Sequence, residues 1–288
     1  MLGVHVAKVS LVLDNKKSSK DISNAITRDV DALGINAVQI FTHGPRAYTK
    51  NKMNYSAINK VCEDLNLSVH SAYPLSNIWN IGSKDDYIVD KLMDHINSCI
   101  EVGAWGLVVH ITKIDYNQAA SVMELLKPIV MPSGVKFVIE MVASKADGDL
   151  TYETPEKINR LTKLVGVSKW WGWCVDTAHL WGAGVDVRKY ADMKKWLDKL
   201  KHPICMFHLN GSSSALGSGK DKHEIAGGPD DCIWGDEHEK GLINYDASGI
   251  RAVVEYAKQY NIPMICEIKR GAESDVIDTL ELIKARLA

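Results

Sequence analysis

Six short apolar runs in this sequence each end in a histidine or an acid. One of them runs from Trp173 to Asp176, and five others end in the same way. The six terminal residues are His70, His110, Glu140, Asp176, His208 and Glu267. A single histidine at the end of a strand is most often a hydrogen-bonded structural residue, but scattered core residues do not repeat this ending six times. We expect six strands that bring these groups to one rim of a sheet or barrel.

The residue types at these endings indicate a metal centre. Burying so many acid and imidazole groups without partners would cost several kcal/mol each, so a bound metal is the simplest partner. Imidazole and carboxylate ligands without thiolates favour Zn²⁺, with Mn²⁺ or Fe²⁺ as lesser options. The sequence therefore predicts a metal cluster at the carboxyl ends of the strands.

Further residues of the same types follow these strands. His179 lies three positions after Asp176, just beyond the strand, so the two need not bind the same ion. Asp221 and His223 are two positions apart in a predicted loop, where alternate side chains point to one side. The same loop contains a competing pair, Asp236 and His238. The first pair is favoured because it lies closer to His208 in the sequence and follows two glycines that let the backbone bend.

The elements that must position these residues form a regular pattern. Continuous apolar strands, rather than alternating ones, indicate a parallel sheet covered on both faces. Predicted strands start near residues 2, 37, 68, 107, 136, 172, 204 and 264. Apolar residues at helical spacing predict helices at about 20–33, 57–65, 84–101, 119–126, 155–165, 190–200, 246–257 (with Asp246 as N-cap) and 276–283.

This order predicts an α/β fold, a single (β/α)8 TIM barrel over residues 1–288 with its active-site groups on the C-terminal rim of the strands. A doubly wound open sheet is the alternative, but the sequence has no GxGxxG turn after the first strand. The stretch at about 211–245 shows neither helical nor strand periodicity, and we expect a long functional loop there. Its acidic part, which contains Asp230, Asp231, Glu237 and Glu239, is typical of a solvated rim.

Composition bounds the function classes. The net charge of −2 argues against an overall polybasic nucleic-acid binder, but it leaves room for a local basic groove. None of the six cysteines forms a CxxC pair, and three lie inside apolar runs, so we expect free thiols in an intracellular, reducing compartment (cytoplasm, nucleus or virion). The sequence predicts no membrane span and no signal peptide, because no apolar stretch is long enough and the first strand begins at once.

The motifs around the six endings resemble the endonuclease IV family of apurinic/apyrimidinic (AP) endonucleases, within the xylose-isomerase-like barrels. The resemblance spans nearly the whole chain, and the order of the motifs is more specific than any one of them. The motifs are Gly3-Val4-His5-Val6, Phe41-Thr42-His43-Gly44-Pro45-Arg46, Val69-His70-Ser71-Ala72-Tyr73, Val109-His110, Ile139-Glu140, Cys174-Val175-Asp176-Thr177-Ala178-His179, Gly182-Ala183-Gly184, His208-Leu209-Asn210-Gly211-Ser212, Asp221-Lys222-His223 and Cys266-Glu267.

The resemblance implies a set of ligands for three zinc ions, with Mn²⁺ as an option at one site. His70 and His110 would hold the first zinc, and Glu140 would bridge it to the second. The second zinc would be held by Asp176, His208 and Glu267, and the third by His179, Asp221 and His223. Two segments depart from the family pattern: the acidic insertion after Gly227-Gly228, and Ser71-Ala72-Tyr73-Pro74 in place of Ala-Pro-Tyr-Leu.

The function implied is that of a zinc-dependent hydrolase of base excision repair. It would cleave the phosphodiester 5′ to an abasic site in double-stranded DNA, leave 3′-OH and 5′-deoxyribose phosphate ends, and trim 3′ ends as a phosphodiesterase. Closely spaced metals stabilise negative charge on the attacking and leaving oxygens, and Glu140 would be the catalytic bridging residue.

We expect Arg46 and Tyr73, just beyond strand ends, to contact the DNA at the gap, and the chain to act as a monomer. Three lysines, Lys50, Lys52 and Lys60, give the adjoining region a positive charge that suits either phosphates or solvent. A metal-dependent sugar isomerase or epimerase of the same superfamily is the alternative, and the trio His179, Asp221 and His223 argues against it. A non-catalytic lesion binder is disfavoured because every ligand position is filled.

Overall fold

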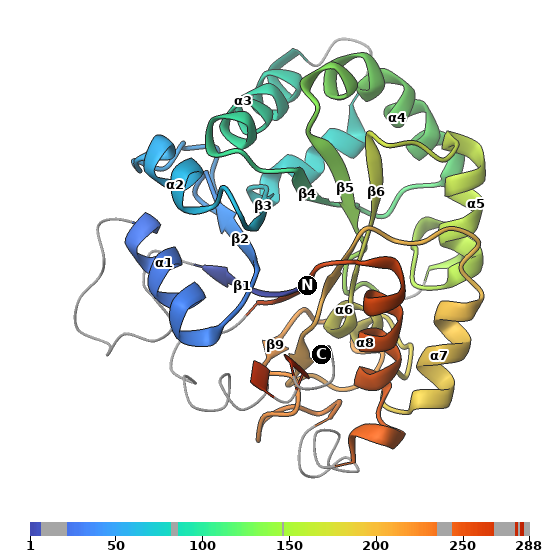
Figure 1. Ribbon diagram of the computed structural model, residues 1–288. Helices are drawn as coiled ribbons and strands as arrows, with labels where there is room; N and C mark the ends of the chain where they lie inside the picture. The colour runs from blue at the N-terminus through green and yellow to red at the C-terminus, as the bar shows by residue number, and fades with distance from the viewer. Residues whose placement is uncertain are drawn as a thin grey trace.

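The computed structural model describes residues 1–6, 22–81, 86–145, 147–234, 244–267, 280–281 and 283–284. Eight parallel strands close into a barrel in the order β1-β10-β7-β6-β5-β4-β3-β2, and the helices form an outer ring around it (Figure 1). The barrel strands are β1 (Leu2–Val6), β2 (Ala37–Phe41), β3 (Asn66–His70), β4 (Gly106–His110), β5 (Lys136–Glu140), β6 (Trp171–Asp176), β7 (Met206–His208) and β10 (Met264–Cys266). The predicted α/β TIM barrel is therefore confirmed, and the open doubly wound sheet is excluded.

The helices lie close to their predicted positions, except that the short helix at Thr177–Gly182 was not predicted. They are α1 (Ile22–Leu33), α2 (Tyr55–Val61), α3 (Asp86–Val102), α4 (Tyr116–Val130), α5 (Pro155–Val165), α6 (Thr177–Gly182), α7 (Tyr190–Asp198) and α8 (Gly249–Tyr260). Short 3₁₀ helices are η1 (Tyr73–Asn80), η2 (Met131–Ser133), η3 (Gly148–Leu150) and η4 (Tyr245–Ala247). Local chemistry sets several starts: for α5, Thr154 accepts a hydrogen bond from the Lys157 N–H, and Pro155 occupies the first helical position.

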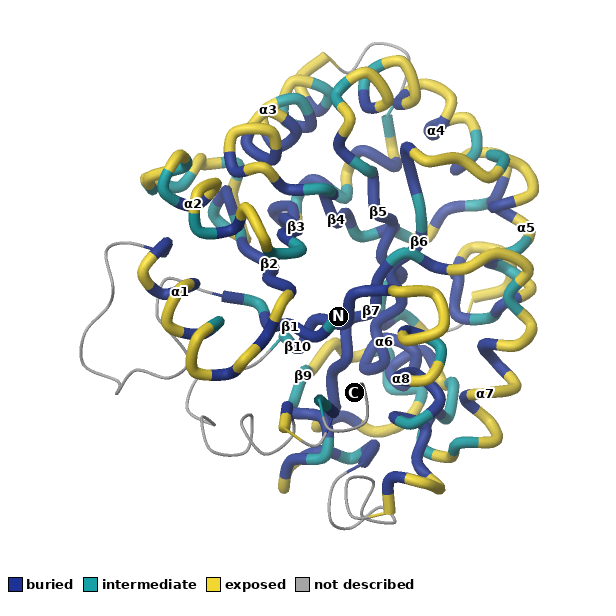
Figure 2. The backbone as a smooth tube through the Cα atoms, in the orientation of Figure 1, coloured by how far each residue is buried: buried dark blue, intermediate teal, exposed yellow. Residues whose placement is uncertain are grey.

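Two layers of buried apolar side chains stabilise the barrel. The strands are buried on both faces, while the helices expose their outer sides (Figure 2). The larger layer lies between strands and helices. The interior of the barrel holds a smaller cluster made of Ala37, Val108, Val138, Cys174, Met206 and Ile265. This burial on both faces explains why the strands are continuously apolar in the sequence.

The start of α8 was predicted wrongly. Asp246 does not cap α8: it lies in η4, and Ser248, which is extended, accepts a hydrogen bond from the Ile250 N–H instead. The stretch after residue 210 contains a two-stranded antiparallel hairpin, β8 (Gly211–Ser212) with β9 (His223–Glu224), that is too short to show periodicity. Most of the predicted closing helix at 276–283 lies outside the described residues; Leu280 and Ile283, which are described, are buried.

Across the described part of the chain, no helix combines the length and apolar character that a membrane crossing requires. All six cysteines are free, in line with the expected thiols.

Candidate metal centre

The predicted ligands occupy one layer of the barrel interior. Because strand side chains alternate, the residue two positions after an interior residue also points inward. Each interior apolar residue is followed in this way by a polar one nearer the carboxyl end, for example Val108 by His110 and Val138 by Glu140. Adjacent strands also place these residues in register: His110 pairs with Glu140, and Asp176 pairs with His208. The fold therefore gathers them into a ring at one rim.

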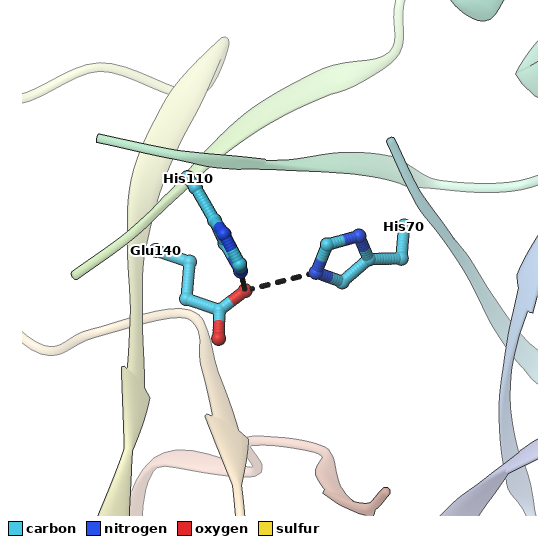
Figure 3. A group of neighbouring side chains, drawn as sticks. All are labelled: His70, His110 and Glu140. Carbon is cyan, nitrogen blue, oxygen red and sulfur yellow. Dashed lines mark hydrogen bonds and ion pairs between the residues drawn. The ribbon is translucent and has the colours of Figure 1, made fainter. Parts of the chain in front are cut away.

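The first cluster consists of His70, His110 and Glu140. The Nε2 atoms of His70 and His110 lie 3.2 Å and 3.1 Å from Oε2 of Glu140, and the two rings are close to perpendicular (Figure 3). Both nitrogens thus converge on one carboxylate oxygen, in the arrangement that two imidazoles and a carboxylate adopt around a shared ion.

The second cluster uses the other oxygen of the same glutamate. Nδ1 of His208 lies 2.9 Å from Oε1 of Glu140, 3.4 Å from Oε2 of Glu267 and 3.7 Å from Oδ2 of Asp176. Glu140 therefore presents one oxygen to each cluster. Burial alone would raise the pKa of this carboxyl, but the surrounding histidines, His208 and His110 foremost, hold it well below its usual range.

The third cluster lies at the edge of the ring. Nε2 of His179, Nε2 of His223 and Oδ1 of Asp221 are separated by 3.4 Å, 3.4 Å and 2.9 Å. Asp176 reaches it too, with Oδ2 3.5 Å from Nε2 of His223. Asp221 is half exposed, whereas His179 is buried. Asp176 and His179 were expected to belong to different metal sites. In the structure Asp176 faces both the second and the third cluster, so the two sites share this residue's surroundings.

The orientation of the His70 and His179 rings leaves their Nε2 atoms free to bind a metal ion. Nδ1 of His70 donates to the carbonyl of Ser71 at 2.8 Å, and Nδ1 of His179 donates to that of Met141 at 2.7 Å. A carbonyl can only accept, so a neutral ring carries its proton on Nδ1 and keeps a lone pair on Nε2. Such a backbone acceptor behind the ring is the usual partner of a metal-binding histidine.

These clusters fit metal ions by distance and by charge. In a tetrahedral zinc site with ligand distances of about 2.0–2.1 Å, ligand atoms lie about 3.3–3.4 Å apart, close to the separations seen here. Four acids lie in the clusters: Glu140, Asp176, Asp221 and Glu267. Among the described residues, all of their ion-pair partners are histidines. Burial lowers the affinity of His179 and His223 for protons, but Asp176 and other acids raise their pKa values to about 10 and about 9. The centre therefore attracts positive charge.

Three further members of the ring were missed from the sequence. Gln39 is buried; its Oε1 accepts from Nε2 of His208 at 3.0 Å, and its Nε2 donates to Oε1 of Glu267 at 2.8 Å. The same amide nitrogen donates to Nδ1 of His5 at 3.0 Å. Asn210 donates to Oδ2 of Asp176 at 2.7 Å. A polar Gln39 inside an apolar strand was the available signal, as was the position of Asn210 two residues after His208.

The hairpin that carries Asp221 and His223 is docked on α6, the short helix that carries His179. The Gly217 and Gly219 amides donate to the carbonyls of Trp181 and Gly182, at 3.0 Å and 2.9 Å. Both donors have positive φ values, 67° and 68°, which favour glycine. Gly217 and Gly219 are the two glycines expected to let the backbone bend, and the loop bends at them where it meets α6.

An open cavity of about 530 Å³ lies over the centre. Its lining includes His70, His110, Asp221, His223 and Glu267 together with Tyr73, which is 45% exposed. The Tyr73 ring stacks on His110 with ring centroids 5.5 Å apart. Five of the nine predicted ligands therefore line the same cavity as Tyr73.

Arg46 is exposed on the neighbouring loop, and Pro45 of that loop accepts the Tyr73 N–H at 2.8 Å. Burial raises the pKa of Tyr73 to about 12, and the positive charge of Arg46 opposes this shift. Of the three nearby lysines, Lys50 is paired with Glu101 at 2.9 Å, so its charge is partly compensated.

Comparison with known proteins assigns the family. Residues 27–286 match the xylose isomerase-like TIM barrel family. A probable AP endonuclease of African swine fever virus (isolate Pig/Kenya/KEN-50/1950) is 30% identical over 249 residues, covering 82% of this chain and 80% of the relative. A probable endonuclease 4 of Mycoplasma mobile is 28% identical over 249 residues, 81% of each chain. The solved structure "The crystal structure of AsfvAP:AG" superposes with a TM-score of 0.84 at 25% identity, covering 100% of this chain and 99% of that one. The chain thus belongs to the xylose isomerase-like TIM barrels and, within them, to the endonuclease IV family of AP endonucleases.

Proposed function

We propose that this protein is a zinc-dependent AP endonuclease of base excision repair. It hydrolyses the phosphodiester 5′ to an abasic site, leaves 3′-OH and 5′-deoxyribose phosphate ends, and trims 3′ ends as a phosphodiesterase. The observation that carries the proposal is the position of Glu140, whose two oxygens face two separate ligand clusters beneath an open cavity.

In this proposal the three clusters hold three zinc ions, with Mn²⁺ as an option at one of them. His70, His110 and Glu140 take the first, Glu140, Asp176, His208 and Glu267 the second, and His179, Asp221 and His223 the third. Adjacent divalent ions stabilise the charge that develops on both the attacking and the leaving oxygen of a phosphodiester.

The chain's own residues supply position and shape. Gln39 and Asn210 hold the ligands His208, Glu267 and Asp176 in fixed orientations, so little reorganisation is needed during reaction. Tyr73 contributes an aromatic face at the cavity mouth. We assign Tyr73 to the gap left by the missing base and Arg46 to the adjacent phosphates. The abasic nucleotide itself costs less to extrude than a paired one.

Replacing Tyr73 with Ala is expected to weaken binding to abasic duplex by about 10-fold and binding to undamaged duplex by much less. Stacking beside the gap depends on the lesion and is worth about 1–3 kcal/mol per base, whereas phosphate contacts do not depend on it. Binding would be measured by fluorescence anisotropy on matched duplexes.

Tyr87, which is 61% exposed and does not line the cavity, is the matched control, and Tyr87→Ala is expected to bind both duplexes like wild type. Equal losses on both duplexes for Tyr73→Ala would make Tyr73 a packing residue.

A sugar isomerase or epimerase on the same barrel is the second candidate. It needs one or two metals, and the pair of ligands on the docked hairpin, Asp221 and His223, favours the nuclease, because it builds a third cluster beside the other two.

Removal of metal tests the function directly. Dialysis against a strong chelator is expected to abolish cleavage of a labelled duplex with one abasic site, and Zn²⁺ is expected to restore it. Mg²⁺ is not expected to restore it, since imidazole-rich sites suit zinc rather than a hard cation. An undamaged duplex of the same sequence is the control substrate. Rescue by Mg²⁺ alone, or zinc-dependent interconversion of sugar isomers without cleavage of DNA, would refute the proposal.

We further propose that residues 1–288 act as one catalytic domain and as a monomer, that the loop at about 211–245 belongs to its active site, and that the free thiols reflect a reducing intracellular compartment.

A further inference from the structure

Asp231 lies in the middle of the long loop, and its environment differs from the solvated rim that its acidic neighbourhood predicts. The side chain is 3% exposed. Its Oδ1 accepts the N–H groups of Ser212 and Ile233, at 2.9 Å and 2.8 Å. Its Oδ2 accepts those of Gly227 and Trp234, at 2.8 Å and 3.1 Å. One carboxylate therefore satisfies four buried or partly buried backbone donors.

The four donors come from segments that must hold together for the hairpin to exist. Ser212 belongs to β8, and it pairs directly with His223 on β9. Ile233 and Trp234 are fully buried against the barrel, and the Trp234 indole donates to the carbonyl of Val187 at 3.3 Å. Asp231 thus connects an anchored turn to the strand beside His223.

Space around the carboxylate is equally restricted. A Cβ added to Gly211 would lie 2.4 Å from Cγ of Asp231, so no side chain fits there without moving the carboxylate. The Cys232 N–H also donates to the carbonyl of Ser212, at 2.7 Å, next to the bond from the Ser212 N–H to Asp231. These contacts fix β8 against the turn on both of its sides.

We propose that Asp231 is the positioning residue of the third cluster: by fixing the hairpin, it holds Asp221 and His223 against His179. The inference rests on the proposed metal centre. Asp231 touches none of the ligands itself and acts through Ser212 and the β8–β9 pairing. Asp231 is in this way part of the framework of the site.

The test is a zinc titration of the full chain in Asp231→Asn. An amide offers one acceptor oxygen, so whichever way it turns, one pair of N–H donors loses its partner. We expect one of three zinc ions to bind about 10- to 100-fold more weakly, as for other residues that orient metal ligands, and the other two to bind as in wild type. Competition with a chromophoric chelator measures each affinity, and excess zinc is expected to restore the lost ion.

The matched control is Asp230→Asn, because Asp230 is exposed and adjacent in sequence; it should bind zinc like wild type. Gly211→Ala, which retains the Asp231 carboxylate but displaces it from its position, provides a second variant and should weaken binding of the same ion. Wild-type affinity for all three ions in both Asp231→Asn and Gly211→Ala would overturn the inference, as would equal loss of every ion. If the wild-type protein itself holds no zinc, the proposed function fails instead, whatever Asp231 does.

Discussion

Glu140→Gln is expected to leave the barrel folded while lowering incision of abasic DNA by at least about 10³-fold. The reason lies in the two oxygens of Glu140, which face different clusters at 3.1–3.2 Å and 2.9 Å from histidine nitrogens. A glutamine keeps the shape of the side chain, but it replaces one of the two proposed ligand oxygens with an NH₂ group and removes the negative charge that would offset repulsion between the two proposed ions.

Single-turnover incision, zinc content and circular dichroism should be measured together on this variant. Glu153 is another buried glutamate, paired with Lys157 at 2.7 Å and outside the metal centre, so Glu153→Gln controls for the loss of a buried carboxylate. Activity near that of wild type in a fully zinc-loaded Glu140→Gln protein would remove Glu140 from the catalytic centre.

His223→Ala is expected to lower bound zinc from about three to about two ions per chain and to cripple cleavage. His223 supplies the Nε2 atom 2.9 Å from Asp221 and 3.4 Å from His179, so its removal takes away one of the three ligands proposed for the third zinc and leaves His179 and Asp221, too few for a zinc site. Elemental analysis of the purified variant gives the stoichiometry.

His238→Ala tests the competing assignment within the same loop. Asp236 and His238 lie outside the described residues, whereas Asp221 and His223 meet His179 in the folded chain. We expect His238→Ala to retain all its zinc and its activity. If it were this variant that lost an ion, the third site would have been assigned to the wrong pair.

Much of the fold follows from local patterns in the sequence. Each strand is buried on two faces and therefore appears as an unbroken apolar run, and the polar residue that ends a run marks the rim of the barrel. The helix start at Thr154 depends only on a side chain and the next turn, which makes it visible without tertiary information. His110 and Glu140 meet because β4 and β5 are in register. This register is set by the folded barrel and is not visible in either strand alone.

The remaining features depend on contacts between distant segments. Gln39 has one amide shared by His5, His208 and Glu267, and nothing near it in the sequence indicates these partners. Asp231 appeared to belong to a solvated acidic stretch, because its four backbone donors can be recognised only once the loop has folded. Composition alone cannot distinguish a carboxylate that is exposed to solvent from a buried one that binds the backbone N–H groups of a loop.

The alternation of side chains along the strands also determines where this protein can change in length. Six of the ligands occupy inward positions at strand ends, each two residues beyond a residue that faces the barrel interior, such as Val138 before Glu140 or Met206 before His208. Inserting or deleting one residue in such a strand would turn its ligand toward the helices and bring an apolar side chain into the ring. We therefore expect this protein to tolerate changes of length in the segments between strands, and in the docked loop after β7 only where Asp221, His223 and the turn at Asp231 keep their positions.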